Sequence, residues 1–130
     1  MKLNQDCVRD TLLFIESDLQ FGEFFHLDDF YESSKLKKYN HDTIKYTLGK
    51  LSETEYLHAT PTWMNNDLTR FSTGMLTWEG HQFLDTIRDN KVWSKTKSIT
   101  SKFSSVSIST LQAVSGQVIA ALIKNSLNIP

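Results

Sequence analysis

The stretch from Leu76 to Trp93, LTWEGHQFLDTIRDNKVW, carries the clearest helix signals in the chain. Thr77 is suited to cap a helix, because its hydroxyl can accept a hydrogen bond from an unpaired backbone N–H of the first turn. An apolar stripe with helical spacing i, i+3, i+4, i+7 follows, formed by Gly80, Phe83, Leu84 and Ile87. Glycine is a poor helix former, so its place on this stripe predicts close approach of a neighbouring backbone.

Two further helices are expected before this stretch. Asn4 or Asp6 can cap the first, whose apolar stripe is Val8, Leu12, Ile15 and Leu19. Asn40 caps the second, whose stripe is Ile44, Leu48 and Leu51. Between them, residues 21–31 are rich in aromatic residues, and Phe24, Phe25, Leu27 and Phe30 are expected to be buried. A short strand near 23–27 and a short helix from Asp28 are expected there.

Two strands are expected immediately before Thr77. Residues 56–63 favour a strand, and Pro61 restricts it to the edge of a sheet because proline has no N–H to donate. The turn cluster 65–67, Asn-Asn-Asp, tolerates left-handed backbone conformations. Residues 68–76 return as the second strand, with an irregularity expected at Gly74.

The composition changes after Trp93. Residues 94–109 contain nine serine or threonine residues, which is typical of a linker. A terminal apolar helix is expected from about Thr110 to Leu127, and it must dock either on its own domain or on another copy of the chain. The domain organisation expected is therefore a domain at 1–93, a linker at 94–109 and a C-terminal helix at 110–130.

The order of these elements defines the expected fold class. The junction Leu-Thr-x-x-Gly-x-x-x-Leu, from Leu76 to Leu84, resembles the passage from wing to helix in winged-helix proteins. We expect an α+β, mostly α chain: a winged helix-turn-helix-like domain with a two-stranded wing and an extra C-terminal helix. Such a resemblance concerns fold more than function.

Three segments together resemble one protein family, domain-of-unknown-function family 2513. They are KLNQDCVRDTLLFIE (2–16), LTWEGHQFLDTIRDNKVWSKTK (76–97) and the apolar terminal helix. The resemblance implies a winged-helix-like fold and a phage or prophage source, and it implies no established activity. Related sequences tend to have Gly-Leu-Ile where this chain has Glu55-Tyr56-Leu57, a departure that concerns the turn into the wing.

Composition restricts the function classes. Fourteen Lys and Arg residues against fifteen Asp and Glu residues leave a formal charge of −1, which counts against strong phosphate-driven binding. The single cysteine, Cys7, excludes an intrachain disulfide and fits a reducing compartment. The N-terminus has no apolar run suited to a signal peptide, and no stretch of 18 apolar residues exists. We expect a cytoplasmic location in a bacterial host cell and no membrane partner.

Motifs for chemistry are sparse. The sequence contains no nucleophile–base motif, phosphate-binding glycine loop or metal-ligand spacing. The least implausible catalytic group is His81 with Glu79 and Asp85, but a histidine and a carboxylate one helical turn apart more often form a structural pair. We expect no enzyme, no catalytic residues, no metal and no cofactor.

The first functional hypothesis is a DNA-binding regulator acting on double-stranded DNA. In a winged helix, the helix capped by Asn40 would enter the major groove. The contacts expected are Lys35, Lys37, Lys38, His41, Thr43, Lys45, Tyr46 and Arg70. The alternative for this helix is an ordinary solvated face.

The second hypothesis is a protein-interaction module that binds and modulates a host protein. It follows from the near-neutral charge, the base-poor wing and the surplus of aromatic residues. Trp78 either anchors a partner or packs within the chain. A homo-oligomer formed through the terminal helix is also expected, and the interface residues proposed are Trp78, Leu111, Val114, Val118 and Leu122.

Overall fold

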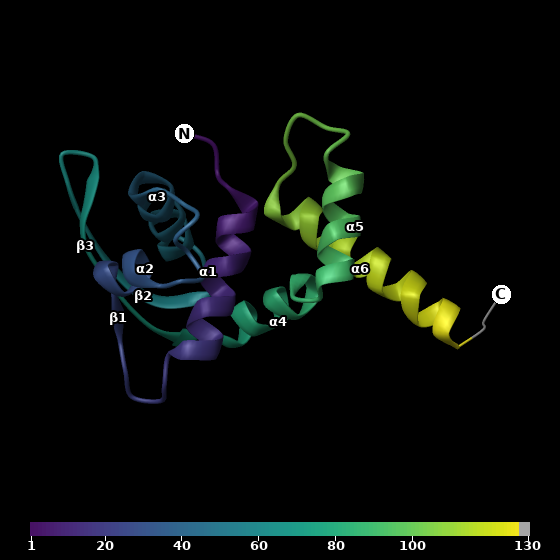
Figure 1. The fold of residues 1–130 in the computed structure, drawn as a ribbon, viewed down its shortest axis with the longest axis horizontal. Helices are drawn as coiled ribbons and strands as arrows, with labels where there is room; N and C mark the ends of the chain where they lie inside the picture. The colour runs from purple at the N-terminus through teal and green to yellow at the C-terminus, as the bar shows by residue number, and fades with distance from the viewer. Residues whose placement is uncertain (128–130) are drawn as a thin grey trace. The chain divides into compact units, whose positions relative to one another are not determined.

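The computed structural model describes residues 1–127 and places six helices and three strands in them. In chain order these are α1 (Gln5–Asp18), β1 (Phe25–His26), α2 (Leu27–Glu32), α3 (His41–Ser52), β2 (Leu57–Met64), β3 (Asp67–Leu76), α4 (Trp78–Ile87), α5 (Asn90–Thr100) and α6 (Ile108–Ser126) (Figure 1). The chain is therefore α+β and mostly α, as expected.

The chain divides into two compact units, residues 1–82 and 83–130. The boundary falls inside α4, and not after Trp93 as the sequence analysis placed it. Trp93 itself lies in α5, because α4 ends at Ile87 and Asp89 caps the next helix by accepting a hydrogen bond from the Val92 N–H at 3.0 Å.

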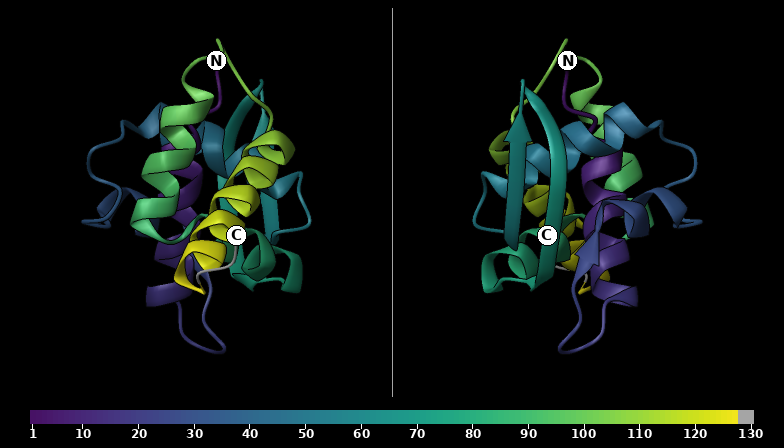
Figure 2. Two further views of the ribbon diagram at one scale, coloured as in Figure 1. Left: turned by 90° about the vertical axis from the view of Figure 1, so that its right-hand side faces the viewer. Right: turned by 90° about the vertical axis from the view of Figure 1, so that its left-hand side faces the viewer.

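The first unit has the element order expected of a winged-helix-like domain. Its antiparallel sheet has the strand order β1-β3-β2, so the expected two-stranded wing is extended to three strands by β1. The right-hand view of Figure 2 shows β2 and β3 side by side. Asn65 and Asn66 form their turn with φ angles of 51° and 62°, the left-handed conformation that asparagine tolerates.

The β2–β3 pairing confirms two local expectations. Pro61 lies in β2, which is an edge strand in this sheet. The register passes from the pair Leu57–Leu76 to the pair Ala59–Thr73, so β3 contains one residue more than β2 around Gly74. This is the irregularity expected at the glycine, and it increases the local twist of the strand.

Phe30 is the centre of the core in the first unit. Its ring is fully buried and meets the rings of Phe14, Phe25 and Phe71 edge-on, at centroid distances of 5.5, 5.9 and 5.8 Å. These contacts join α1, β1, α2 and β3. The expectation that Phe24 is buried together with Phe25, Leu27 and Phe30 was wrong, because Phe24 is 64% exposed. Successive strand residues face opposite sides of a sheet, and Phe25 takes the inner side.

The helix caps follow the sequence closely. The side chains of Asn4, Asn40 and Thr77 accept hydrogen bonds from the N–H groups of Cys7, Thr43 and Gly80 at 3.0, 2.8 and 3.0 Å. The expectation for α2 was less accurate, because the helix begins at Leu27. There the Asp29 carboxylate accepts a hydrogen bond from the His26 N–H at 2.7 Å.

A close backbone contact holds the start of α4 against the residues before β2. The Thr77 N–H donates to the Tyr56 carbonyl at 2.9 Å, and the Thr77 hydroxyl donates to the Glu55 carbonyl. A Cβ atom added at Gly80 would overlap the Tyr56 carbonyl oxygen and lie 3.2 and 3.3 Å from the Tyr56 carbonyl carbon and Cα. The close approach expected from Gly80 is thus confirmed.

The second unit contains α5 and α6, which pack against each other and lie side by side in the left-hand view of Figure 2. The linker expected at 94–109 was wrong for residues 94–100, which belong to α5. The hydroxyls of Thr96 and Ser115 are fully buried and lie 3.1 Å apart, within hydrogen-bonding distance. A buried hydroxyl pair of this kind is satisfied and needs no water.

The apolar face of α6 is covered only in its first half. Leu111, Ser115 and Val118 are buried, whereas every residue from Ala120 to Leu127 is exposed. The expected helix segment 110–130 includes residues 128–130, which lie outside the described residues. Within residues 1–127, no helix has the length and apolar character needed to cross a membrane.

We expect Gly80→Ala to lower the free energy of unfolding by about 1–3 kcal/mol, because the Tyr56 backbone cannot move aside as a flexible side chain could. Urea denaturation followed by circular dichroism measures this change. The matched control is Gly116→Ala in α6, where an added Cβ meets nothing within 4 Å. The control should gain up to about 1 kcal/mol from helix propensity. Equal stability of Gly80→Ala and the wild-type chain would contradict the contact.

Candidate interaction surface on α3 and the β2–β3 hairpin

The α3–wing surface is formed by outward residues of α3 and by the tip of the β2–β3 hairpin. We define it by Asp42, Lys45, Tyr46, Trp63 and Asp67. These residues line a shallow pocket of about 200 Å³ together with Met1, Asn66 and Leu68. Figure 1 shows the hairpin beside α3, and the two elements are in contact.

Trp63 is the largest side chain of this surface and rests on α3. A Cβ atom added at Gly49 would lie 2.6 Å from Cη2 and 2.8 Å from Cζ2 of the indole. Trp63 nevertheless remains 48% exposed, and the neighbouring Met64 is 60% exposed. One side of the indole is therefore held by the helix, while its other side is exposed to solvent.

The charges of the α3–wing surface are neutralised by one another. Lys45 Nζ lies 3.0 Å from Asp67 Oδ1, an ion pair that joins α3 to β3. The hydrogen bond to Asp67 raises the pKa of Lys45. One helical turn further on, Lys50 pairs with Glu53 at 3.5 Å. The surface is consequently aromatic and close to neutral, with Asp42 as an additional carboxylate.

His41 and Tyr31 connect α2 to the start of α3. Their rings are stacked, with centroids 3.9 Å apart and an interplanar angle of 7°. The Tyr31 hydroxyl is buried and has no hydrogen-bond partner within the described residues. Burial raises the pKa of Tyr31, so this hydroxyl stays protonated. His41 thus has a structural contact in addition to its expected DNA contact.

The lysines expected to contact DNA before α3 are mostly paired with carboxylates of α1. Lys35 Nζ pairs with Asp18 and also donates to the Ser17 hydroxyl at 2.7 Å. Lys38 Nζ lies 3.1 Å from Asp10 Oδ2. These lysines line a second pocket of about 340 Å³ beside α1. Lys37 is exposed, and no ion pair involves it among the residues described.

The remaining residues of the expected DNA-binding set lie apart from one another. Thr43 is half-buried, and its carbonyl accepts a hydrogen bond from the Thr47 hydroxyl at 2.8 Å. Arg70 is exposed and pairs in register with Thr62. It follows that Arg70 lies on the sheet face opposite to its neighbour Phe71, which is buried in the core. The structure brings only Lys45 and Tyr46 onto one surface with the hairpin tip.

The residues expected to form a partner interface are also divided. Trp78 is 75% exposed at the start of α4, and Leu122 is 39% exposed on α6. Leu111 and Val118 are buried, and Val114 is half-buried. Leu111 and Val118 are therefore core residues of the described chain.

Two members of the group considered for catalysis, His81 and Asp85, pair with other residues. His81 Nδ1 lies 3.3 Å from Glu16 Oε2 of α1, and Asp85 Oδ1 lies 2.7 Å from the guanidinium of Arg88. In residues 1–127, no three His, Cys, Asp or Glu side chains gather as metal ligands. Burial raises the pKa of the Cys7 thiol, which keeps it in its unreactive protonated form.

Sequence reasoning missed the contact between Trp63 and Gly49. A strand tryptophan beside a turn and a glycine in the middle of a helix are separate signals along the chain. Only their apposition shows that the glycine makes room for the indole. A glycine inside an otherwise regular helix was the available sign, as it was at Gly80.

The first unit thus carries an aromatic surface on α3 and the hairpin, in which Lys45 and Asp67 neutralise each other. A family model described as "Hypothetical protein (DUF2513)" matches residues 2–107, and the chain belongs to this family. The match covers α1 to α5 and ends where α6 begins. It confirms the family resemblance seen in the sequence, while the phage or prophage source stays a prediction.

One relative spans almost the whole chain. An uncharacterised protein of Haemophilus influenzae is 27% identical over 124 residues, which are 95% of this chain and 99% of the relative. No solved structure matches the chain.

We expect Gly49→Ala to displace the Trp63 indole from α3, because the added methyl group would occupy the position of the ring edge. The measurement is the ¹⁹F NMR spectrum of protein labelled with 5-fluorotryptophan, assigned with single Trp→Phe variants. The Trp63 resonance should shift while those of Trp78 and Trp93 stay unchanged. An unmoved Trp63 resonance would show that the indole does not rest on Gly49.

Proposed function

We propose that this protein is a non-enzymatic interaction module that binds a partner polypeptide through the α3–wing surface. The observation that supports the proposal best is the half-exposed Trp63 held against Gly49. Tryptophan and tyrosine are enriched among the residues that contribute most to binding at protein interfaces. An indole already held in place also loses little conformational freedom when a partner binds.

The electrostatics of the surface favour a polypeptide over a nucleic acid. Phosphate binding needs lysines or arginines whose charge is available, and affinity for DNA rises with each phosphate neutralised. On α3, Lys45 is paired with Asp67 and Lys50 with Glu53. Asp42 on the same helix would repel a phosphate. A neutral surface with aromatic residues is, in contrast, the usual composition of an interface core.

The experiment uses a displayed library of random peptides selected against the full chain. Enriched peptides should perturb the NMR resonances of α3 and the hairpin tip. Trp63→Ala should weaken their binding by about 30-fold, the effect of a side chain worth about 2 kcal/mol.

The matched control is Trp78→Ala, because Trp78 is a more exposed tryptophan outside the α3–wing surface. Peptides that still bind Trp63→Ala, or that lose as much affinity with Trp78→Ala, would contradict the proposed surface.

A second candidate is the DNA-binding regulator expected from the sequence. One observation favours it: α3 follows α2 after a connection at residues 33–40, and Lys37 in that connection is exposed without an ion pair among the described residues. The helix would then lie in the major groove, as in other helix-turn-helix proteins.

Fluorescence anisotropy with duplex DNA between low and physiological salt tests this candidate. Groove binding by α3 would give a salt slope of about −0.9 for each phosphate contact. Lys37→Gln should reduce that slope by about 1. No binding to cognate promoter DNA or random duplexes at low salt would reject the DNA candidate and leave the polypeptide proposal standing.

A further inference from the structure

The ionisable side chains are distributed very unequally along the chain. All fifteen Asp and Glu residues lie within residues 1–89, together with nine of the fourteen Lys and Arg residues. Residues 90–130 carry five lysines and no acidic side chain. The near-zero net charge of the whole chain thus conceals an acidic first part and a basic last part. Such an asymmetry is a recognised sign of interaction with an anionic partner.

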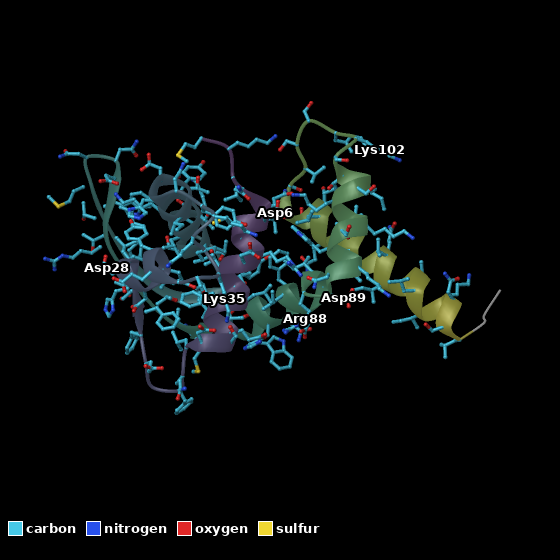
Figure 3. All side chains as sticks on the ribbon, in the orientation of Figure 1. Asp6, Asp28, Lys35, Arg88, Asp89 and Lys102 are labelled. Atoms are coloured by element: carbon cyan, nitrogen blue, oxygen red, sulfur yellow. The ribbon has the colours of Figure 1, made fainter. Side chains whose placement is uncertain are left out.

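Three of these lysines lie along the solvent side of α5 and its following loop. Lys91 and Lys95 are exposed one turn apart on the helix, and Lys102 is exposed in the loop (Figure 3). Exposed serines lie between them, at positions 94, 98 and 101. Val92, Trp93, Thr96 and Thr100 form the opposite, buried side of α5.

These lysines differ from those of the first unit in their surroundings. The only acidic side chains of the second unit are Asp85 and Asp89. Asp85 pairs with Arg88, and Asp89 caps α5. No ion pair involves Lys91, Lys95 or Lys102 within residues 1–127, whereas Lys35, Lys38 and Lys45 each have a carboxylate partner. In the second unit, the lysines without an ion pair therefore include Lys91 and Lys95 on α5 and Lys102 in the loop after it.

The same unit exposes large apolar side chains. Ile99 and Phe103, next to Lys102, are 37% and 65% exposed. On the second half of α6, Leu122, Ile123 and Leu127 are 39%, 54% and 62% exposed. Lys124 is the only charged residue in α6. A helix of this composition, half of it uncovered, is unusual for a protein surface in contact with water.

We propose that residues 83–127 form a docking surface for the face of a lipid bilayer that carries anionic headgroups. Lys91, Lys95 and Lys102 would bind lipid phosphates, and the exposed apolar residues of the loop and α6 would enter the boundary between headgroups and acyl chains. Lysines combined with aliphatic and aromatic side chains are the composition of segments that lie on membranes. This mode requires no helix that spans the bilayer.

A bilayer accounts for both sets of residues, and a nucleic acid accounts for only one. Phosphates of a nucleic acid would suit the lysines and serines of α5. A bound nucleic acid would leave the apolar side chains exposed to water, namely Phe103, Leu122, Ile123 and Leu127. The proposal is independent of the α3–wing surface, because it concerns residues of the other unit.

The test is co-sedimentation of the full chain with vesicles of pure phosphatidylcholine and with vesicles that also contain phosphatidylglycerol. Binding should require phosphatidylglycerol and weaken as salt increases from low to physiological concentration. Each lysine near an anionic surface adds about 1 kcal/mol. The variant Lys91→Gln/Lys95→Gln/Lys102→Gln should therefore lower the partition coefficient by about two orders of magnitude.

The matched control removes the same charge from the first unit, as Lys35→Gln/Lys37→Gln/Lys38→Gln. It should retain most of the binding, because two of these lysines are already paired with carboxylates. An equal loss in both triple variants would overturn the proposal, since net charge alone would then explain binding. Circular dichroism establishes that each variant is folded.

The apolar part of the surface is tested with Leu122→Ser/Ile123→Ser, which should lower binding to phosphatidylglycerol vesicles by about tenfold or more. Three results would overturn the proposal. The first is equal binding to both vesicle types, and the second is binding to duplex DNA without binding to vesicles. The third is a chain that does not bind vesicles and forms lipid-free dimers in light scattering, which Leu122→Ser/Ile123→Ser converts to monomers. The last result would assign α6 to a second copy of the chain.

Discussion

The contact between Gly80 and the Tyr56 backbone holds the start of α4 against the residues that lead into β2. Because glycine has no Cβ, the first turn of α4 can lie directly on the chain that leads into β2. Thr77 strengthens this contact in two ways, by capping α4 and by donating its N–H to the Tyr56 carbonyl. The two ends of the β2–β3 hairpin are thereby held together, and the hairpin is positioned beside α3. The α3–wing surface depends on this arrangement, since Trp63 reaches Gly49 only from that position.

Charge is organised differently in the two units, and this difference separates their proposed roles. In the first unit, carboxylates of α1 and β3 neutralise Lys35, Lys38 and Lys45, which lie near α3. What remains there is an aromatic surface, which suits a polypeptide better than a phosphate backbone. In the second unit, the lysines of α5 have no acidic neighbours in the sequence that follows them. A chain with almost no net charge can thus contain one neutral and one cationic surface.

Local rules of the sequence predicted much of the first unit and less of the second. The caps at Asn4, Asn40 and Thr77, the left-handed turn at Asn65-Asn66 and the irregularity at Gly74 each depend on a few neighbouring residues, and all were found. The linker expected at 94–109 rested on composition alone. Serine and threonine normally indicate solvent exposure, but Thr96 and Ser115 satisfy each other inside the α5–α6 packing. From the sequence, a hydroxyl of this kind is expected to be exposed to solvent. In the fold it lies in the core.

Local patterns in the sequence predicted the helices α1, α3, α4 and α6, the hairpin, the family and the close approach at Gly80. These follow from periodicity, capping and turn chemistry, which act over a few residues. Which charges are paired and which aromatic side chains are exposed depends on the tertiary structure. Lys45 and Asp67 are 22 residues apart along the chain, and Trp63 and Gly49 belong to different elements. Ion pairs and packing contacts depend on distances in space, so residue types alone could not show that Lys35, Lys38 and Lys45 are paired with carboxylates.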